Sequence, residues 1–169
     1  MDIDHIRDLY DYHYALHRKV WGCIDYLTDE QFTQPIPYSI GAVRNHMIHL
    51  ASADQRWIAR VAGVSLPDRL SYDDYPTQAA ARAKWDEVEV RVLDVVMNQI
   101  TDADLVRVIE YPIHRAVTPD RTFTATSAVW QILVHIVNHG TDHRAQVLRL
   151  LHDFGAPTLE QDMMIYWWE

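Results

Sequence analysis

The sequence predicts an all-α fold, a four-helix bundle with a short β-hairpin or a pair of extended arms between its third and fourth helices. Four long stretches carry apolar residues at helical spacing. Only five Gly and seven Pro occur in 169 residues, which leaves long stretches free for helix. Before the last stretch the pattern changes to β-branched and alternating residues. The length fits a single domain over residues 1–169.

The first half of the chain predicts two helices. Apolar and aromatic side chains recur every three or four positions across 1–27, which is expected to be the first helix. Pro35 and Pro37 break any helix and predict an extended connection over 29–38. Ser39 is the expected N-cap of a second helix, which ends at Gly63.

The second half predicts a third helix, the extended arms and a fourth helix. The third helix is expected to start at Pro76 or Thr77 and to run to Ile100. Residues 105–111 (LVRVIEY) and 121–126 (RTFTAT) are the predicted arms, separated by a turn-rich stretch.

The fourth helix is expected to begin after Ser127 and to end before Gly155 and Pro157. The stretch that follows, TLEQDMMIYWWE, is strongly aromatic at its end. We expect it to pack on the bundle, and a subunit interface is the alternative.

Composition excludes several classes of partner. The formal net charge is −9 and no long basic run occurs, so neither nucleic acid nor an anionic membrane is an expected partner. No apolar stretch is long enough to span a membrane and the N-terminus lacks a signal-peptide pattern, so a cytoplasmic protein is expected. Cys23 is the only cysteine, which excludes a disulfide within the chain, and its apolar neighbours predict a buried thiol.

Histidines concentrate in the predicted fourth helix. His135, His139 and His143 follow one another at four-residue spacing and therefore share one stripe of a helix. His135 and His143 lie roughly 12 Å apart along the axis, too far to share an ion easily, so a metal would take either His135 with His139 or His139 with His143. The alternative is a row of hydrogen-bonded histidines in the bundle seam. His13 and His17 in the first helix form a rival pair.

The chain resembles the DinB/YfiT-like family of bacterial proteins over nearly its whole length. The similarity rests on SIGAVRNHMIHLASADQRW, on the two arms, and on HIVNHGTDHRAQVLRLLHDFGAP followed by Asp162. Its most specific part is the pattern H-x-x-x-H-R-x-Q, which starts at His139. Ala145 stands where many members have Gly.

The resemblance implies a metal site and a class of reaction. Members are four-helix bundles, often dimeric, in which one His of the second helix and two of the fourth hold zinc or nickel. Carried over, the ligands are His49, His139 and His143, and a homodimer is expected. The resemblance also implies transfer of a low-molecular-weight thiol to an electrophilic small molecule. Hydrolysis by a metal-bound water, or a non-catalytic metal-binding bundle, are the alternatives.

Other residues are candidates for supporting this site. His135 and His46 are candidates for orienting the ligands or closing the site, as are Asp54 and Asp142. Arg56, Arg60 and Arg144 are candidates for holding an anionic thiol or substrate, and Trp57 and Tyr14 for lining a pocket over the metal. No sequence pattern identifies a catalytic side chain.

Overall fold

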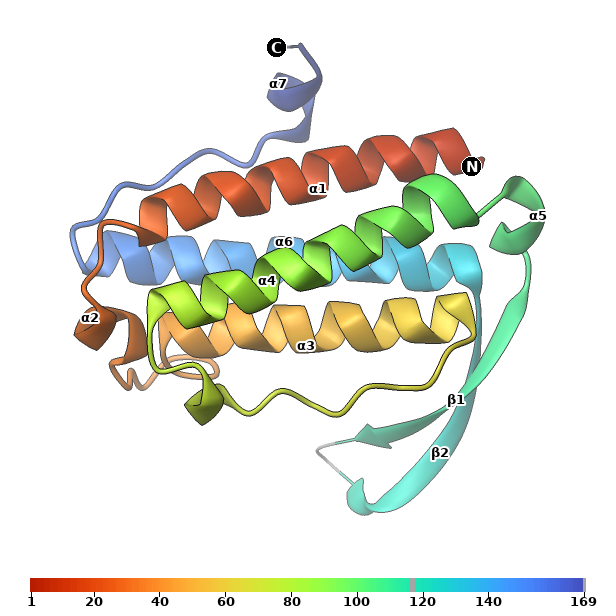
Figure 1. Ribbon diagram of the computed structural model, residues 1–169, viewed down its shortest axis with the longest axis horizontal. Helices are drawn as coiled ribbons and strands as arrows, with labels where there is room; N and C mark the ends of the chain where they lie inside the picture. Colours follow the sequence, from red (N-terminus) through yellow and green to blue (C-terminus); the bar gives the residue numbers. More distant parts are fainter. Residues whose placement is uncertain (116–117, 169) are drawn as a thin grey trace.

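Four long helices lie side by side and form the body of the molecule (Figure 1). The computed structural model describes residues 1–115 and 118–168. The four helices are α1 (Ile3–Ile24), α3 (Val43–Ala62), α4 (Gln78–Asp94) and α6 (Val129–Asp153). The predicted four-helix bundle is confirmed.

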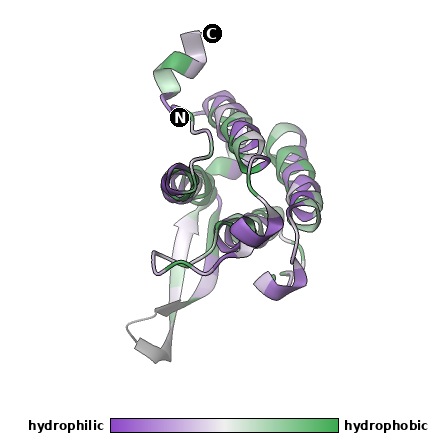
Figure 2. Ribbon diagram, turned by 90° about the vertical axis from the view of Figure 1, so that its left-hand side faces the viewer, coloured by the Kyte–Doolittle hydropathy of each residue, from purple (hydrophilic) through white to green (hydrophobic). Residues whose placement is uncertain are grey.

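The core lies between these helices. α3 packs against both α4 and α6, and α1 packs against α6. Viewed from the side in Figure 2, the helices stand around a shared interior and the hairpin projects away from them. Trp21 and Trp85 are almost completely buried in this core, with ring centroids 6.4 Å apart. Burial of such side chains stabilises the fold by roughly 1.5–3 kcal/mol each.

Two predicted N-caps are wrong. Ser39 lies in a turn with φ of +51°, and α3 starts four residues later with Ala42 as its N-cap. Ser127 belongs to a strand, and α6 starts after Ala128, whose backbone N–H donates to the side chain of Gln131. The predicted end at Gly63 is confirmed, because this residue takes the left-handed conformation that ends α3.

The segment expected to be an extended connection contains a short helix, α2 (Asp29–Thr33). Thr28 accepts a hydrogen bond from the backbone N–H of Gln31, and the Gln31 side chain accepts one from the backbone N–H of Thr28. This capping box starts the helix before the two prolines end it. Pro35 and Pro37 therefore indicate only where α2 ends.

Three short elements lie between the end of α3 and the hairpin. η1 (Tyr72–Asp74) lies in the connection between α3 and α4. The third predicted helix runs nearly as expected, but its last turn is a π-helix, η2 (Val95–Gln99). The short helix α5 (Asp102–Leu105) then leads into the hairpin.

The two arms form an antiparallel hairpin of β1 (Val108–Arg115) and β2 (Thr118–Ala128). Both strands extend into the stretch predicted as a turn, where Pro112 lies opposite Thr124. A two-stranded sheet has only edge strands, so the missing N–H of a proline costs little there. The tip at 116–117 lies outside the described residues.

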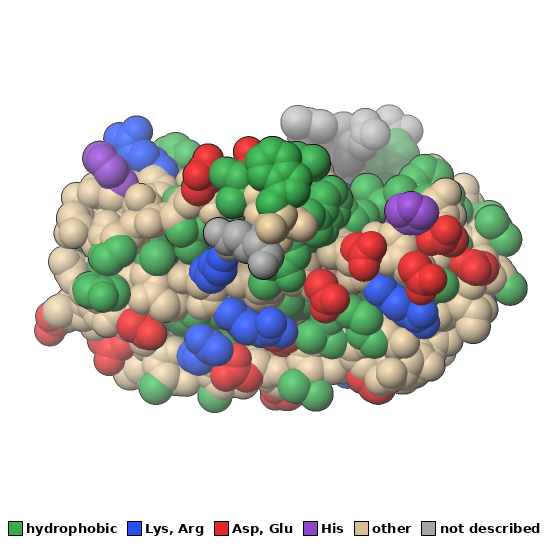
Figure 3. Space-filling view, turned by 90° about the horizontal axis from the view of Figure 1, so that it is seen from above, with side chains coloured by type: hydrophobic (Ala, Val, Ile, Leu, Met, Phe, Trp, Pro, Cys, Tyr) green, Lys and Arg blue, Asp and Glu red, His purple; other side chains and the backbone are tan. Residues whose placement is uncertain are grey.

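The C-terminal segment ends in a short helix, α7 (Met163–Trp168), above α1 (Figure 1). Tyr166 packs against Tyr12 with ring centroids 5.4 Å apart. Figure 3 shows hydrophobic side chains gathered on this face, and Trp167 and Trp168 remain 49% and 76% exposed. The C-terminal segment therefore packs only partly on the bundle. Among the described helices, none is both long and apolar enough to cross a membrane.

Candidate metal centre

Three histidines from two neighbouring helices converge at one place. His49 lies on α3, and His139 and His143 lie on successive turns of α6. One ring nitrogen from each lies within 4.8 Å of the others. Among the described residues, only these three form such a group. The four-residue spacing of His139 and His143 on α6 places both rings beside His49 of α3, and His135 lies one turn away.

These imidazoles are neutral near pH 7. Burial lowers the pKa of His49 to about 4 and that of His139 to about 3, and the neighbouring His143 adds to both effects. Burial also lowers the pKa of His143. A neutral imidazole keeps a lone pair on one ring nitrogen, which is the form that binds metals.

The ring positions fit a divalent ion. The Nε2 atoms of His49 and His139 are 3.2 Å apart. Two nitrogens bound to one tetrahedral zinc at about 2.0–2.1 Å lie about 3.3–3.4 Å apart. The donor set of three imidazoles is also one that zinc and nickel accept.

A fourth histidine supports the group from the buried side. The Nδ1 atom of His46, on α3, lies 2.9 Å from the Nδ1 atom of His143. Both rings are buried. Burial lowers the pKa of His46 to about 4, so its ring is also neutral and can accept a hydrogen bond. His46 therefore holds the ring plane of His143.

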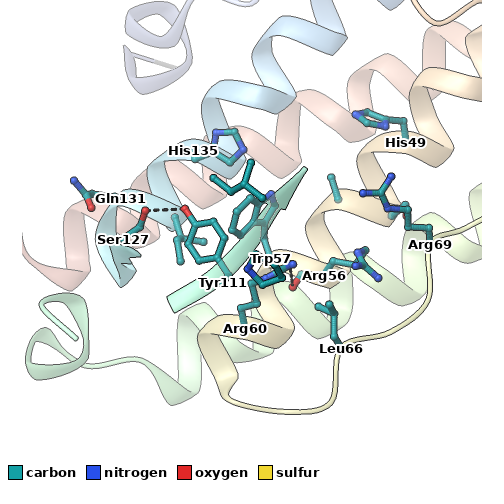
Figure 4. Close-up of a pocket in the computed structure, with 15 residues that line it drawn as sticks. His49, Arg56, Trp57, Arg60, Leu66, Arg69, Tyr111, Ser127, Gln131 and His135 are labelled. Carbon is teal, nitrogen blue, oxygen red and sulfur yellow. Dashed lines mark hydrogen bonds between the residues drawn. The ribbon is translucent and has the colours of Figure 1, made fainter. Parts of the chain in front are cut away.

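A cleft opens beside the cluster (Figure 4). Its volume is about 630 Å³, and α3, β1 and α6 all contribute to it. Trp57 packs perpendicular to Tyr111, with ring centroids 5.1 Å apart, and lies 5.4 Å from the ring of His135. The lining residues are His49, Ser52, Ala53, Arg56, Trp57, Arg60, Leu66, Arg69, Tyr111, Pro112, Ile113, Ser127, Gln131, Ile132 and His135. One member of the histidine cluster thus faces a space large enough for a small molecule.

Of the residues expected to hold an anion or to line a pocket, Arg144 and Tyr14 do not line this cleft. Arg144 is fully buried, where its Nε donates to Gln161 and one terminal nitrogen lies 3.1 Å from Nδ1 of His13. Tyr14 is buried and donates to Asp54 at 3.2 Å. Both residues belong to a polar network in the interior of the bundle. The role expected of Arg144 in holding an anion does not fit this position.

The rival pair His13 and His17 belongs to the same interior. Their rings lie 4.4 Å apart, and the Nε2 atom of His13 is 3.9 Å from a carboxylate oxygen of Asp54. Burial lowers the pKa of both histidines well below its usual value. These side chains are completely buried, so they form part of the core.

Comparison with known proteins agrees with this architecture. The model of the DinB family matches residues 3–169. The chain belongs to the DinB family. It is 23% identical over 158 residues to Protein DinB of Bacillus subtilis (strain 168), covering 94% of this chain and 91% of that protein. The crystal structure of a DinB-like protein from Bacillus cereus ATCC 10987 has the same fold, with a TM-score of 0.73 at 16% identity, covering 94% of this chain and 97% of the other.

Membership of the DinB family and the three-histidine cluster together fit a metal-binding protein. Arg69 and Tyr111 are among the residues of the cleft that sequence reasoning missed. Arg69 lies in an irregular connection, where no periodicity indicates which way a side chain points. Tyr111 could have been found from its alternation within the predicted arm.

Proposed function

We propose that His49, His139 and His143 hold a divalent metal, zinc or nickel, and that the protein transfers a low-molecular-weight thiol to an electrophilic small molecule. The observation that carries this proposal is the convergence of three neutral imidazoles beside an open cleft. Three protein ligands and an accessible fourth position are typical of catalytic rather than structural zinc sites.

Each residue has a distinct part in this reaction. A metal held by these three imidazoles would supply a lowered pKa for a thiol in the cleft, so that the thiol could act as a nucleophile. His46 keeps His143 oriented through the contact between their Nδ1 atoms. Trp57 and His135 form a wall of the cleft against which the electrophile can pack. The bundle core behind the cluster limits the access of water to one side.

The thiol must come from a second molecule. Cys23 is the only cysteine of the chain and is buried in α1, away from the residues that line the cleft. Burial raises the pKa of its thiol, which makes it a poor nucleophile. A transferase that uses an external thiol is consistent with both facts.

Metal content is the first test. We expect about one zinc or nickel per chain in protein purified without an affinity tag, measured by elemental analysis. His49→Ala and His139→Ala should each lose the metal, because the two imidazoles that remain bind it far more weakly than three. His152→Ala is the matched control, since His152 lies exposed on α6 outside the cluster. Wild-type protein that contains no metal and cannot be loaded would contradict the proposal.

The same proteins then test the reaction. Metal-loaded wild type should accelerate the attack of small thiols on an aryl halide, and the two ligand variants should not. The products distinguish the reactions, because thiol transfer gives a thioether and hydrolysis gives a phenol. Phenol as the main enzymatic product would replace thiol transfer by hydrolysis.

A further inference from the structure

Three arginines gather in the cleft of an acidic protein. Arg56 and Arg60 lie on α3, and Arg69 lies in the connection that follows it. Figure 4 shows them along one side of the cleft, with His49 next to Arg69. The chain as a whole carries a net charge of −9, so this concentration of positive charge opposes the overall composition.

The three guanidinium groups have no acidic partner. Among the described residues, no carboxylate forms an ion pair with Arg56, Arg60 or Arg69. Arg56 donates to the carbonyl of Pro67, and Arg60 donates to the carbonyl of Arg56 at 3.1 Å. A guanidinium has five N–H groups, so each of these arginines keeps donors that the described part of the chain does not engage.

Arg60 is held against the aromatic wall of the cleft. Its guanidinium carbon lies 4.8 Å from the centre of the Trp57 ring and 5.8 Å from that of Tyr111. Stacking of this kind fixes the plane of the guanidinium while its edge remains free to bind an anion.

The other polar groups of the cleft are neutral and partly engaged within the protein. The hydroxyl groups of Tyr111 and Ser127 bond to each other at 2.8 Å. The side-chain oxygen of Gln131 accepts from the backbone N–H of Ala128, and the Ser52 hydroxyl accepts from that of Leu70. Arg56, Arg60 and Arg69 are therefore the permanently charged donors that the lining of the cleft offers to a ligand.

Electrostatics within the cleft agree with this picture. Burial lowers the pKa of Arg60, and the charges of Arg56 and Arg69 lower it further. Like charges held this close repel one another, and an anion placed among them relieves that repulsion.

We infer that this cleft binds a small organic acid with at least two carboxylates, recognised by Arg56, Arg60 and Arg69. One carboxylate would neutralise only one of three guanidinium groups, whereas a dicarboxylate can engage two of them through charge-assisted hydrogen bonds. The apolar part of the acid packs on Trp57 and Tyr111. The inference adds the class of substrate to the proposed function. Only the statement that the acid is a substrate rests on that function. Binding itself needs no metal.

Isothermal titration calorimetry with succinate tests this inference on metal-free protein at low salt. We expect succinate to bind wild type at least tenfold more tightly than acetate. Arg69→Gln should weaken succinate binding by about tenfold, because one charge-assisted contact is lost. Arg69 is exposed and makes no hydrogen bond with the described residues, so this variant should fold normally. Arg149→Gln is the control, because Arg149 pairs with Asp153 on α6 outside the cleft.

The outcomes separate this inference from the proposed function. Equal affinity of Arg69→Gln and Arg149→Gln for succinate would overturn it, as would wild type that binds no succinate. Inorganic phosphate that binds as tightly as succinate would also overturn it, because the cleft would then recognise charge alone. Metal content of the same variants, measured before the metal is removed, tests the histidine cluster separately, since a protein without metal can still bind succinate.

Discussion

At the scale of single residues, the contact between His46 and His143 determines which nitrogen of His143 can bind a metal. The two Nδ1 atoms are 2.9 Å apart, so one must carry a proton and the other must accept it. If His143 binds through Nε2, its Nδ1–H donates to His46, whose own proton then lies on Nε2. The pair thus selects one tautomer of the ligand.

Replacing His46 by Ala should therefore weaken metal binding without removing a ligand. We expect the dissociation constant to rise by about 10–100-fold, the usual effect of losing a residue that orients a metal-bound His. Competition with a chromophoric chelator measures this change. His152→Ala should leave the affinity unchanged. An unchanged affinity in His46→Ala would show that the fold alone orients His143.

At the scale of elements, α1 and α6 meet closely at Gly140. A Cβ atom built at this position would lie 2.2 Å from Cε1 of His13, across the helix interface. His13 cannot easily move away, because its side chain is completely buried and its Nδ1 lies 3.1 Å from Arg144. Gly140 lies next to His139, so this close approach also positions a member of the histidine cluster.

Gly140→Ala should destabilise the protein by about 1–3 kcal/mol or more, because the added methyl overpacks the interface. Gly22→Ala is the matched control. It adds the same methyl to α1, where a Cβ would have no neighbour within 4 Å, and should stabilise the helix by up to about 1 kcal/mol. Urea unfolding of the two variants measures both effects. Two variants with equal stability would argue against the close contact.

The order and type of the long elements followed from sequence, but the starts of two helices did not. Ser39 and Ser127 both have the side chain of a good N-cap, yet a tight turn holds the first and pairing between strands holds the second. Likewise, spacing alone predicted that His139 could share an ion with either neighbour on α6. Only the packing of α3 against α6 places His49 beside His139 and His143.

At the scale of the whole molecule, the charges are divided between the surface and the cleft. The chain has 24 acidic and 15 basic residues, but the cleft contains three arginines and no acidic side chain among the residues that line it. An acidic exterior keeps large polyanions away, while the cleft attracts a small anion at short range. The net charge of the sequence does not predict that three arginines gather in one cleft.

The bundle interior also links stability to pH. His13 and His17 are neutral in the folded protein, because burial lowers their pKa well below 6.5. As the pH falls below about 6.5, the two histidines take up protons in the unfolded chain but not in the folded chain. Their contribution to the free energy of unfolding is therefore complete above about pH 6.5 and is lost as the pH falls. Asp54 acts in the opposite sense. Burial raises its pKa from 3.8 to about 7, so between these values only the folded chain holds that proton.

Two histidines against one carboxyl group leave a net uptake of one proton on unfolding. The free energy of unfolding of metal-free protein should therefore fall by about 1.4 kcal/mol per pH unit between roughly pH 5.5 and 4.5, where both histidines of the unfolded chain are protonated, and the cluster histidines add to this slope. Urea unfolding at about pH 5.5, 5.0 and 4.5 measures it. His17→Asn should reduce the slope by about 1.4 kcal/mol per pH unit even if it destabilises the protein, because the slope counts protons and not contacts. His152→Asn should retain the wild-type slope, and equal slopes in both variants would mean that His17 is protonated inside the folded bundle.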